Sequence, residues 1–204
     1  SADWSTSALA QTSIKPFCSA KQLLAAVAGF EAILARGIDA GTIDSVHVSV
    51  PSDFVAMTGH GIGAGNRLSS ITSAPYQMAL AALRRDALYD VARDPFVMTD
   101  EIADLMKKIT VMAEDGLADH LPNQWPARIE VITADRKETI LILDAPGDPA
   151  MPFSIEDVAA KFHAAAGRTL DAAAIDGWVE RARASVIDDD ALEELQTEYL
   201  GFGR

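Results

Sequence analysis

The stretch ARIEVITADRKETILILDA, residues 127–145, constrains the fold more than any other part of this chain. Two runs rich in β-branched residues flank a short polar turn at 134–137, which is the pattern of a β-hairpin. The two strands of a hairpin pair antiparallel, so the sequence predicts a sheet that contains at least one antiparallel pair.

Two shorter runs predict further strands. SVHVSV at 45–50 alternates strictly, with valines on one side and Ser45, His47 and Ser49 on the other. This alternation is typical of a half-buried strand, on which His47 is expected to face solvent. ITVMAED at 109–115 is predicted to form another strand.

Helical periodicity accounts for most of the remaining chain. Thr99 and Ser154 are predicted N-caps, and Asp157 follows the second of them at capping-box spacing. The glycine-rich stretch MTGHGIGAGNRLSS at 57–70 is predicted to be a mobile loop. The predicted helices cover residues 20–36, 75–89, 98–108, 154–162 and 170–198.

This order of elements is not the strand–helix alternation of a doubly wound sheet. It indicates an α+β fold, in which helices cover a small, mostly antiparallel sheet and a C-terminal helical segment follows. We expect an N-terminal arm at residues 1–12, an α+β domain at 13–153 and the helical segment at 154–204.

Composition and charge narrow the classes of function. The 204 residues carry a formal net charge of −13, which argues against a nucleic-acid partner, because that affinity comes largely from clustered Lys and Arg. No apolar run approaches the roughly 20 residues of a membrane-spanning helix. With one cysteine and no signal-peptide pattern, the chain is expected to be cytoplasmic. Its first residue is serine, which suggests processing or a piece of a longer protein.

Several polar residues lack the spacing of a defined site. The four histidines form no metal-binding pattern, so no metal site is expected. Cys18 precedes a helix that could lower its thiol pKa, although a packed, unreactive thiol is the alternative. The glycines at 59–65 do not have the strand–turn–helix register of a phosphate-binding loop. Asp188, Asp189 and Asp190 are predicted to form a solvated connector.

Lys15 stands before a proline in a short apolar turn, just ahead of the first predicted helix. Ile14, Pro16 and Phe17 could desolvate its ammonium and lower its pKa, which suits a group that transfers protons. A surface lysine that extends into water is the alternative. Arg67 could hold a substrate carboxylate through its planar fork, or it could be an ordinary surface arginine.

Four segments come in the order and spacing of one family: TSIKPFCSAKQ (12–22), SAPYQMALAAL (73–83), WPARIEVITADRK (125–137) and APGDPAMPFSIEDVAAKF (145–162). Together they resemble the C-terminal part of the MmgE/PrpD superfamily, over residues 10–195. Its members include 2-methylcitrate dehydratase, cis-aconitate decarboxylase and iminodisuccinate epimerase.

The resemblance implies that 13–153 is a lid-like domain and that 154–204 packs on a large all-helical domain absent from this chain. We therefore expect a separate all-helical chain or N-terminal fragment as partner, and a dimer of such pairs. The implied activity is that of a lyase or isomerase, a dehydratase, decarboxylase or epimerase that uses no cofactor. Its expected chemistry is proton transfer beside the carboxylate or carbonyl of a small substrate.

By the same resemblance, Lys15 matches the lysine of the family's active-site motif. Its implied role is that of a proton donor or acceptor, or of a cation that holds a carboxylate. His60 is the second catalytic candidate. The substrate-binding candidates are Lys21, Gln22, Arg67, Ser73 and Tyr76.

One position departs from the family pattern. Many relatives carry a histidine five residues after the motif lysine, where this chain has Ala20. Lys21 or Gln22 could substitute for that histidine, or the substrate could differ. Ser73 and Tyr76 have packing at the start of a helix as an equally good interpretation.

Two other functions stay open on the sequence. The chain could be a non-catalytic binding or regulatory module that keeps the lid fold, which the alanine at position 20 and the missing helical domain both favour. It could also belong to a catalyst for an unusual substrate, such as an intermediate that needs isomerisation or ring formation.

Overall fold

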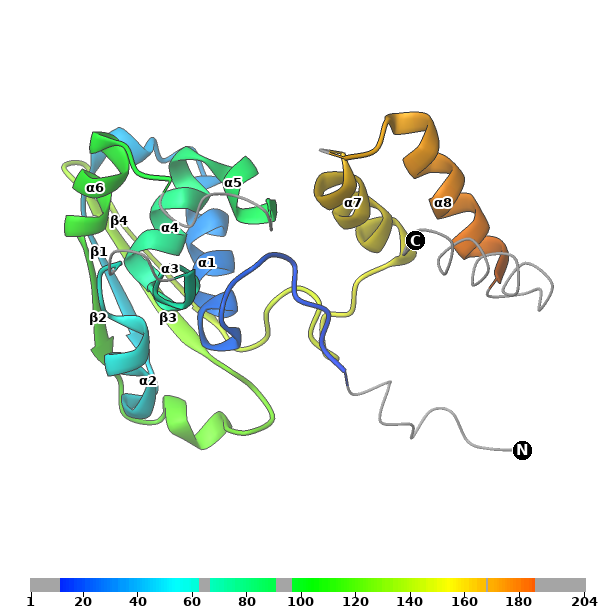
Figure 1. Cartoon of the computed structure of the whole chain (residues 1–204). Helices are drawn as coiled ribbons and strands as arrows, with labels where there is room; N and C mark the ends of the chain where they lie inside the picture. The colour runs from blue at the N-terminus through cyan, green and yellow to red at the C-terminus, as the bar shows by residue number, and fades with distance from the viewer. Residues whose placement is uncertain (1–11, 63–66, 91–96, 168, 186–204) are drawn as a thin grey trace. The chain divides into compact units, whose positions relative to one another are not determined.

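The computed structural model describes residues 12–62, 67–90, 97–167 and 169–185. The chain divides into two compact units, Ser1–Phe153 and Ser154–Arg204 (Figure 1). Within the described ranges, no helix is both long and apolar enough to cross a bilayer.

A four-stranded sheet with the order β2-β1-β3-β4 frames the first unit. The hairpin is confirmed, since β3 and β4 pair antiparallel, as do β1 and β3. β1 and β2 instead run parallel, because the chain crosses over through helices between them, so the sheet is mixed. The strands are β1 (Ile43–Val50), β2 (Ile109–Ala113), β3 (Ala127–Thr133) and β4 (Lys137–Ile142).

Helices cover the apolar face of this sheet and complete the predicted α+β fold (Figure 1). The valines of β1 are buried on that face, while Ser45, His47 and Ser49 lie half-exposed on the other, as the alternation predicts. The helices are α1 (Lys21–Leu34), α2 (Ser52–Thr58), α3 (Arg67–Thr72), α4 (Ala74–Leu83), α5 (Arg85–Tyr89) and α6 (Asp100–Lys107).

The predicted mobile loop at 57–70 is wrong at both ends. Its first two residues finish α2 and its last four begin α3, while residues 63–66 lie outside the described ranges. Asp53 in the first turn favours the start of α2, and the Thr58 hydroxyl donates to the Phe54 carbonyl at 2.8 Å near its end. Both helices are too short for a periodic pattern to predict them.

The predicted helix at 75–89 is divided at Arg84. The backbone of Arg84 has φ −145° and ψ 58°, which is outside the helical region, although its N–H still donates to the Leu80 carbonyl. The chain therefore ends α4 and starts α5 in a new direction.

Gly29 sets how closely α1 approaches the sheet. A Cβ at this position would collide with the Ile129 side chain and lie 3.0 Å from Ile142. We expect Gly29→Ala to lower the free energy of unfolding by about 1–3 kcal/mol through overpacking. Denaturant unfolding followed by circular dichroism measures the change.

Gly177, in the second unit, supplies the control for this substitution. It also lies within a helix, but the nearest atom to its added Cβ is the end of the flexible Arg181 side chain, at 3.4 Å. Alanine has the better helix propensity, so Gly177→Ala should not destabilise. Equal unfolding midpoints for Gly29→Ala and the parent chain would contradict the close packing of α1.

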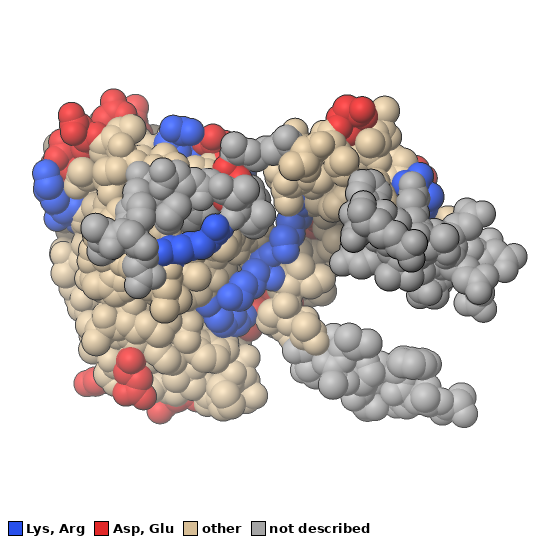
Figure 2. Space-filling model, in the orientation of Figure 1, with Lys and Arg blue, Asp and Glu red and all other residues tan. Residues whose placement is uncertain are grey.

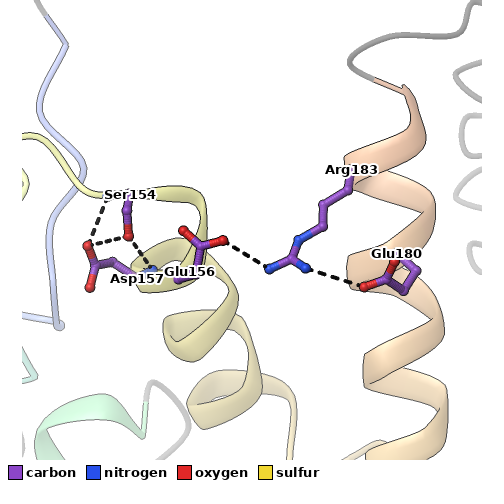
Figure 3. Close-up of polar contacts among 5 residues, drawn as sticks. All are labelled: Ser154, Glu156, Asp157, Glu180 and Arg183. Atoms are coloured by element: carbon purple, nitrogen blue, oxygen red, sulfur yellow. Dashed lines mark hydrogen bonds and ion pairs between the residues drawn. The ribbon is translucent and has the colours of Figure 1, made fainter.

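In its described residues, the second unit contains α7 (Ile155–Ala166) and α8 (Ala172–Ser185), which pack on each other. The predicted capping box is confirmed, since Ser154 and Asp157 each accept from the other's backbone N–H (Figure 3). Arg183 reaches from α8 to Glu156 at 3.5 Å (Figure 3). The predicted helix at 170–198 is described only to 185, and Asp188–Asp190 lie outside the described residues.

Candidate functional site

The segment before α1 presents Lys15 at the surface of the first unit. Its ammonium donates to the Ser19 carbonyl at 3.0 Å, one turn along the chain. The apolar neighbours do not enclose it, because Phe17 is buried in the core and Ile14 is 43% exposed. The first unit therefore leaves the Lys15 side chain open to a ligand or to a partner chain.

Backbone bonds tie this segment to the junction between α3 and α4. The Ala20 N–H donates to the Ile71 carbonyl at 2.9 Å, and the Ser19 hydroxyl lies 3.4 Å from the same oxygen. Ser19 is buried, so this join is part of the packed structure. On the face of the first unit shown in Figure 2, Lys and Arg side chains (blue) and Asp and Glu side chains (red) are both visible among the other residues (tan).

His60 meets the same junction from the end of α2. Its Nε2 lies 3.0 Å from the Thr72 hydroxyl, and its Nδ1 lies 2.5 Å from the Gly61 carbonyl. These two contacts hold the ring with Nε2 toward Thr72 and Nδ1 toward Gly61. The sequence-predicted catalytic residues thus come from two segments that both bond to residues 71–73.

Ser73 and Tyr76 support this arrangement from inside the unit. The buried Ser73 hydroxyl donates to the His60 carbonyl at 2.6 Å and caps α4 by accepting from the Tyr76 N–H. The buried Tyr76 hydroxyl donates to the Val97 carbonyl at 2.9 Å. Ser73 therefore holds the His60 backbone, while the Tyr76 side chain is buried and bonds to Val97.

Lys21 is the first residue of α1, and its ammonium forms an ion pair with Asp148. It also donates to the Ser13 hydroxyl at 3.3 Å. Burial alone would raise the pKa of the Asp148 carboxyl, but the hydrogen bonds from Lys21 and Ser13 outweigh it and lower that pKa. Sequence reasoning missed Asp148 as a functional candidate, although it lies in the segment 145–162, one of the four that carry the family resemblance.

The remaining candidates are near these groups in sequence. Gln22 is half-buried in the first turn of α1, and Arg67 is exposed at the start of α3. The described residues contain no group of three or more His, Cys, Asp or Glu side chains that could hold a metal ion. The Lys15 ammonium is a group that can bind an anion, and the His60 imidazole is a group that can transfer protons. The segments that carry them both bond to residues 71–73.

Comparison with protein families gives a match over most of the chain. The model of the MmgE/PrpD C-terminal domain covers residues 17–183. Comparison with curated proteins gives no match. The matched range begins at Phe17, four residues before Lys21. It includes all of the described α+β unit from that residue onward.

Proposed function

The chain belongs to the MmgE/PrpD family, of which it carries the C-terminal domain, and from this premise we propose that it is one part of a lyase or isomerase. The family includes dehydratases. In our proposal, the active site forms where this domain meets a separate all-helical domain. The substrate is a small carboxylic acid or carbonyl compound, and the assembly works in the cytoplasm as a dimer of such pairs.

The observation that carries the proposal is the convergence of the Lys15 and His60 segments on residues 71–73. Removing a proton beside a carboxylate places extra negative charge on that group, which a nearby ammonium stabilises. An imidazole titrates near neutral pH and can accept or return the proton. We assign the cation or acid role to Lys15 and proton transfer to His60, with Gln22 and Arg67 as substrate-binding groups.

An exposed apolar face on the second unit supports a helical partner. Ile155, Val158 and Phe162 share one face of α7 and are 49%, 38% and 37% exposed. α7 buries none of its residues, although it is an amphipathic helix with a complete capping box. A second helical surface would remove this apolar area from water, which is the main driving force for such association.

We expect the chain alone to be inactive and to gain activity with an all-helical family partner. Small di- and tricarboxylic acids are incubated in D₂O with the chain, the partner and both together. Proton NMR then follows loss of the signal beside a carboxylate and the appearance of dehydrated or decarboxylated products. Full activity of the chain alone would contradict the shared site.

The alternative is a binding or regulatory module without chemistry, which Ala20 favours because many relatives have a histidine there. Intact mass of the native assembly separates the two functions. A stoichiometric helical partner supports the enzyme, while a monomer or a homodimer of this chain alone supports the module.

A further inference from the structure

The segment that carries Lys15, residues 13–20, is hydrogen-bonded to a turn at residues 145–151, which lies more than 120 residues away in sequence. The Ile14 N–H donates to the Gly147 carbonyl at 2.9 Å. Two bonds close the turn itself, from the Gly147 N–H to the Met151 carbonyl and from the Met151 N–H to the Asp148 carbonyl, both at 2.8 Å. The chain on the N-terminal side of Lys15 is therefore held by an ordered loop.

A partly buried ion pair reinforces this attachment on the C-terminal side of Lys15. Asp148 has a side chain that is only 6% exposed, and it accepts from the Lys21 ammonium and from the Ala145 N–H at 2.9 Å. Lys21 in turn donates to Ser13, which precedes Lys15 by two residues. Lys15 thus lies between two points that are both fixed to the same turn.

We propose that Lys21 and Asp148 are positioning residues, which hold the 13–20 segment so that Lys15 is presented to the substrate. The importance of Lys15 itself rests on the proposed function. In this role the Lys21 ammonium is engaged by a carboxylate of its own chain, and it does not replace the family histidine. The pair stabilises the segment because loss of either partner leaves a poorly solvated charge without its counter-ion.

The Cys18 thiol allows this positioning role to be measured directly. Cys18 is the only cysteine, it is half-buried, and it lies within the fastened segment, three residues after Lys15. The rate at which a thiol reagent labels Cys18 in the full chain measures how often the segment opens. This measurement needs neither a substrate nor a partner.

We expect Asp148→Asn to accelerate Cys18 labelling by about ten- to a hundredfold under native conditions, with the circular dichroism spectrum unchanged. Lys21→Met, which changes a partly exposed residue, should give a similar increase, and Lys21→Arg should restore most of the protection because it keeps the charge. The double variant should label no faster than either single variant, since both single changes remove the same interaction.

Glu138→Gln is the matched control, because it removes the Arg36–Glu138 pair elsewhere in the same unit. Parent-like labelling of Asp148→Asn and Lys21→Met would overturn the proposal.

The assembled enzyme provides a second readout. There, Asp148→Asn should lower kcat by about tenfold or more and leave KM within a few-fold, because misplacing Lys15 weakens the transition state more than it weakens binding. A raised KM with unchanged kcat would assign Lys21 to substrate binding and overturn the positioning role. If the parent assembly has no activity, the proposed function fails, whereas the Cys18 result still decides whether the pair orders the segment.

Discussion

Lys15→Ala is expected to reduce kcat/KM of the assembled enzyme by about 10²–10⁴-fold, the range typical of a group that transfers a proton or stabilises charge in the transition state. Its side chain is exposed and, within the described part of the chain, its ammonium bonds to the Ser19 carbonyl, so its removal should leave the fold intact. Steady-state kinetics and thermal unfolding, measured on the same preparations, separate the two effects.

A surface lysine of the same unit provides the matched control. Lys107 has a side chain that is 74% exposed and forms an ion pair with Asp104 in α6. An exposed pair contributes little to stability, so Lys107→Ala should leave both activity and unfolding temperature near those of the parent. Near-parental activity of Lys15→Ala would remove the lysine from the proposed mechanism.

Gly147→Ala is expected to produce the largest loss of stability among substitutions in the turn. Gly147 has φ +89°, and a Cβ there would collide with the Ile14 carbonyl oxygen and lie 3.2 Å from the Phe153 ring. A left-handed conformation costs an L-residue about 1–2 kcal/mol, and the collision with rigid backbone adds to that cost. We expect the free energy of unfolding to fall by about 3 kcal/mol or more, as measured by denaturant titration.

Two other glycines isolate the collision from the backbone strain. Gly37 and Gly116 each have φ +87°, but an added Cβ at either position meets no atom within 4 Å. Gly37→Ala and Gly116→Ala should therefore show the strain alone, about 1–2 kcal/mol. If Gly147→Ala loses no more than these two variants, the close contact between the turn and the Lys15 segment is not present in solution.

Local patterns were sufficient to predict the elements that are regular over several residues. The strict alternation at 45–50 and the two β-branched runs at 127–145 correspond to β1 and the β3–β4 hairpin. The caps at Thr99 and Ser154 form as their side-chain chemistry predicts. The short helices α2 and α3 were missed, because neither extends over enough turns to show a period.

The candidate site also has a part that local sequence indicated and a part that only the fold shows. A short motif drew attention to Lys15, but no pattern indicated that Ile14 would bond to Gly147 or that Lys21 would pair with Asp148. These partners lie far apart in sequence, and only the packing of the chain brings them together. The same packing buries Tyr76, which the sequence alone left as a substrate-binding candidate.

The sequence by itself determined the α+β composition, the hairpin and the helix caps, because each depends on interactions within a few residues. The tertiary structure decided the parallel pairing of β1 with β2, the junction shared by the Lys15 and His60 segments, and the carboxylate partner of Lys21. Those features depend on which distant segments share the core, since a hydrogen bond or ion pair forms only between groups that folding places in contact.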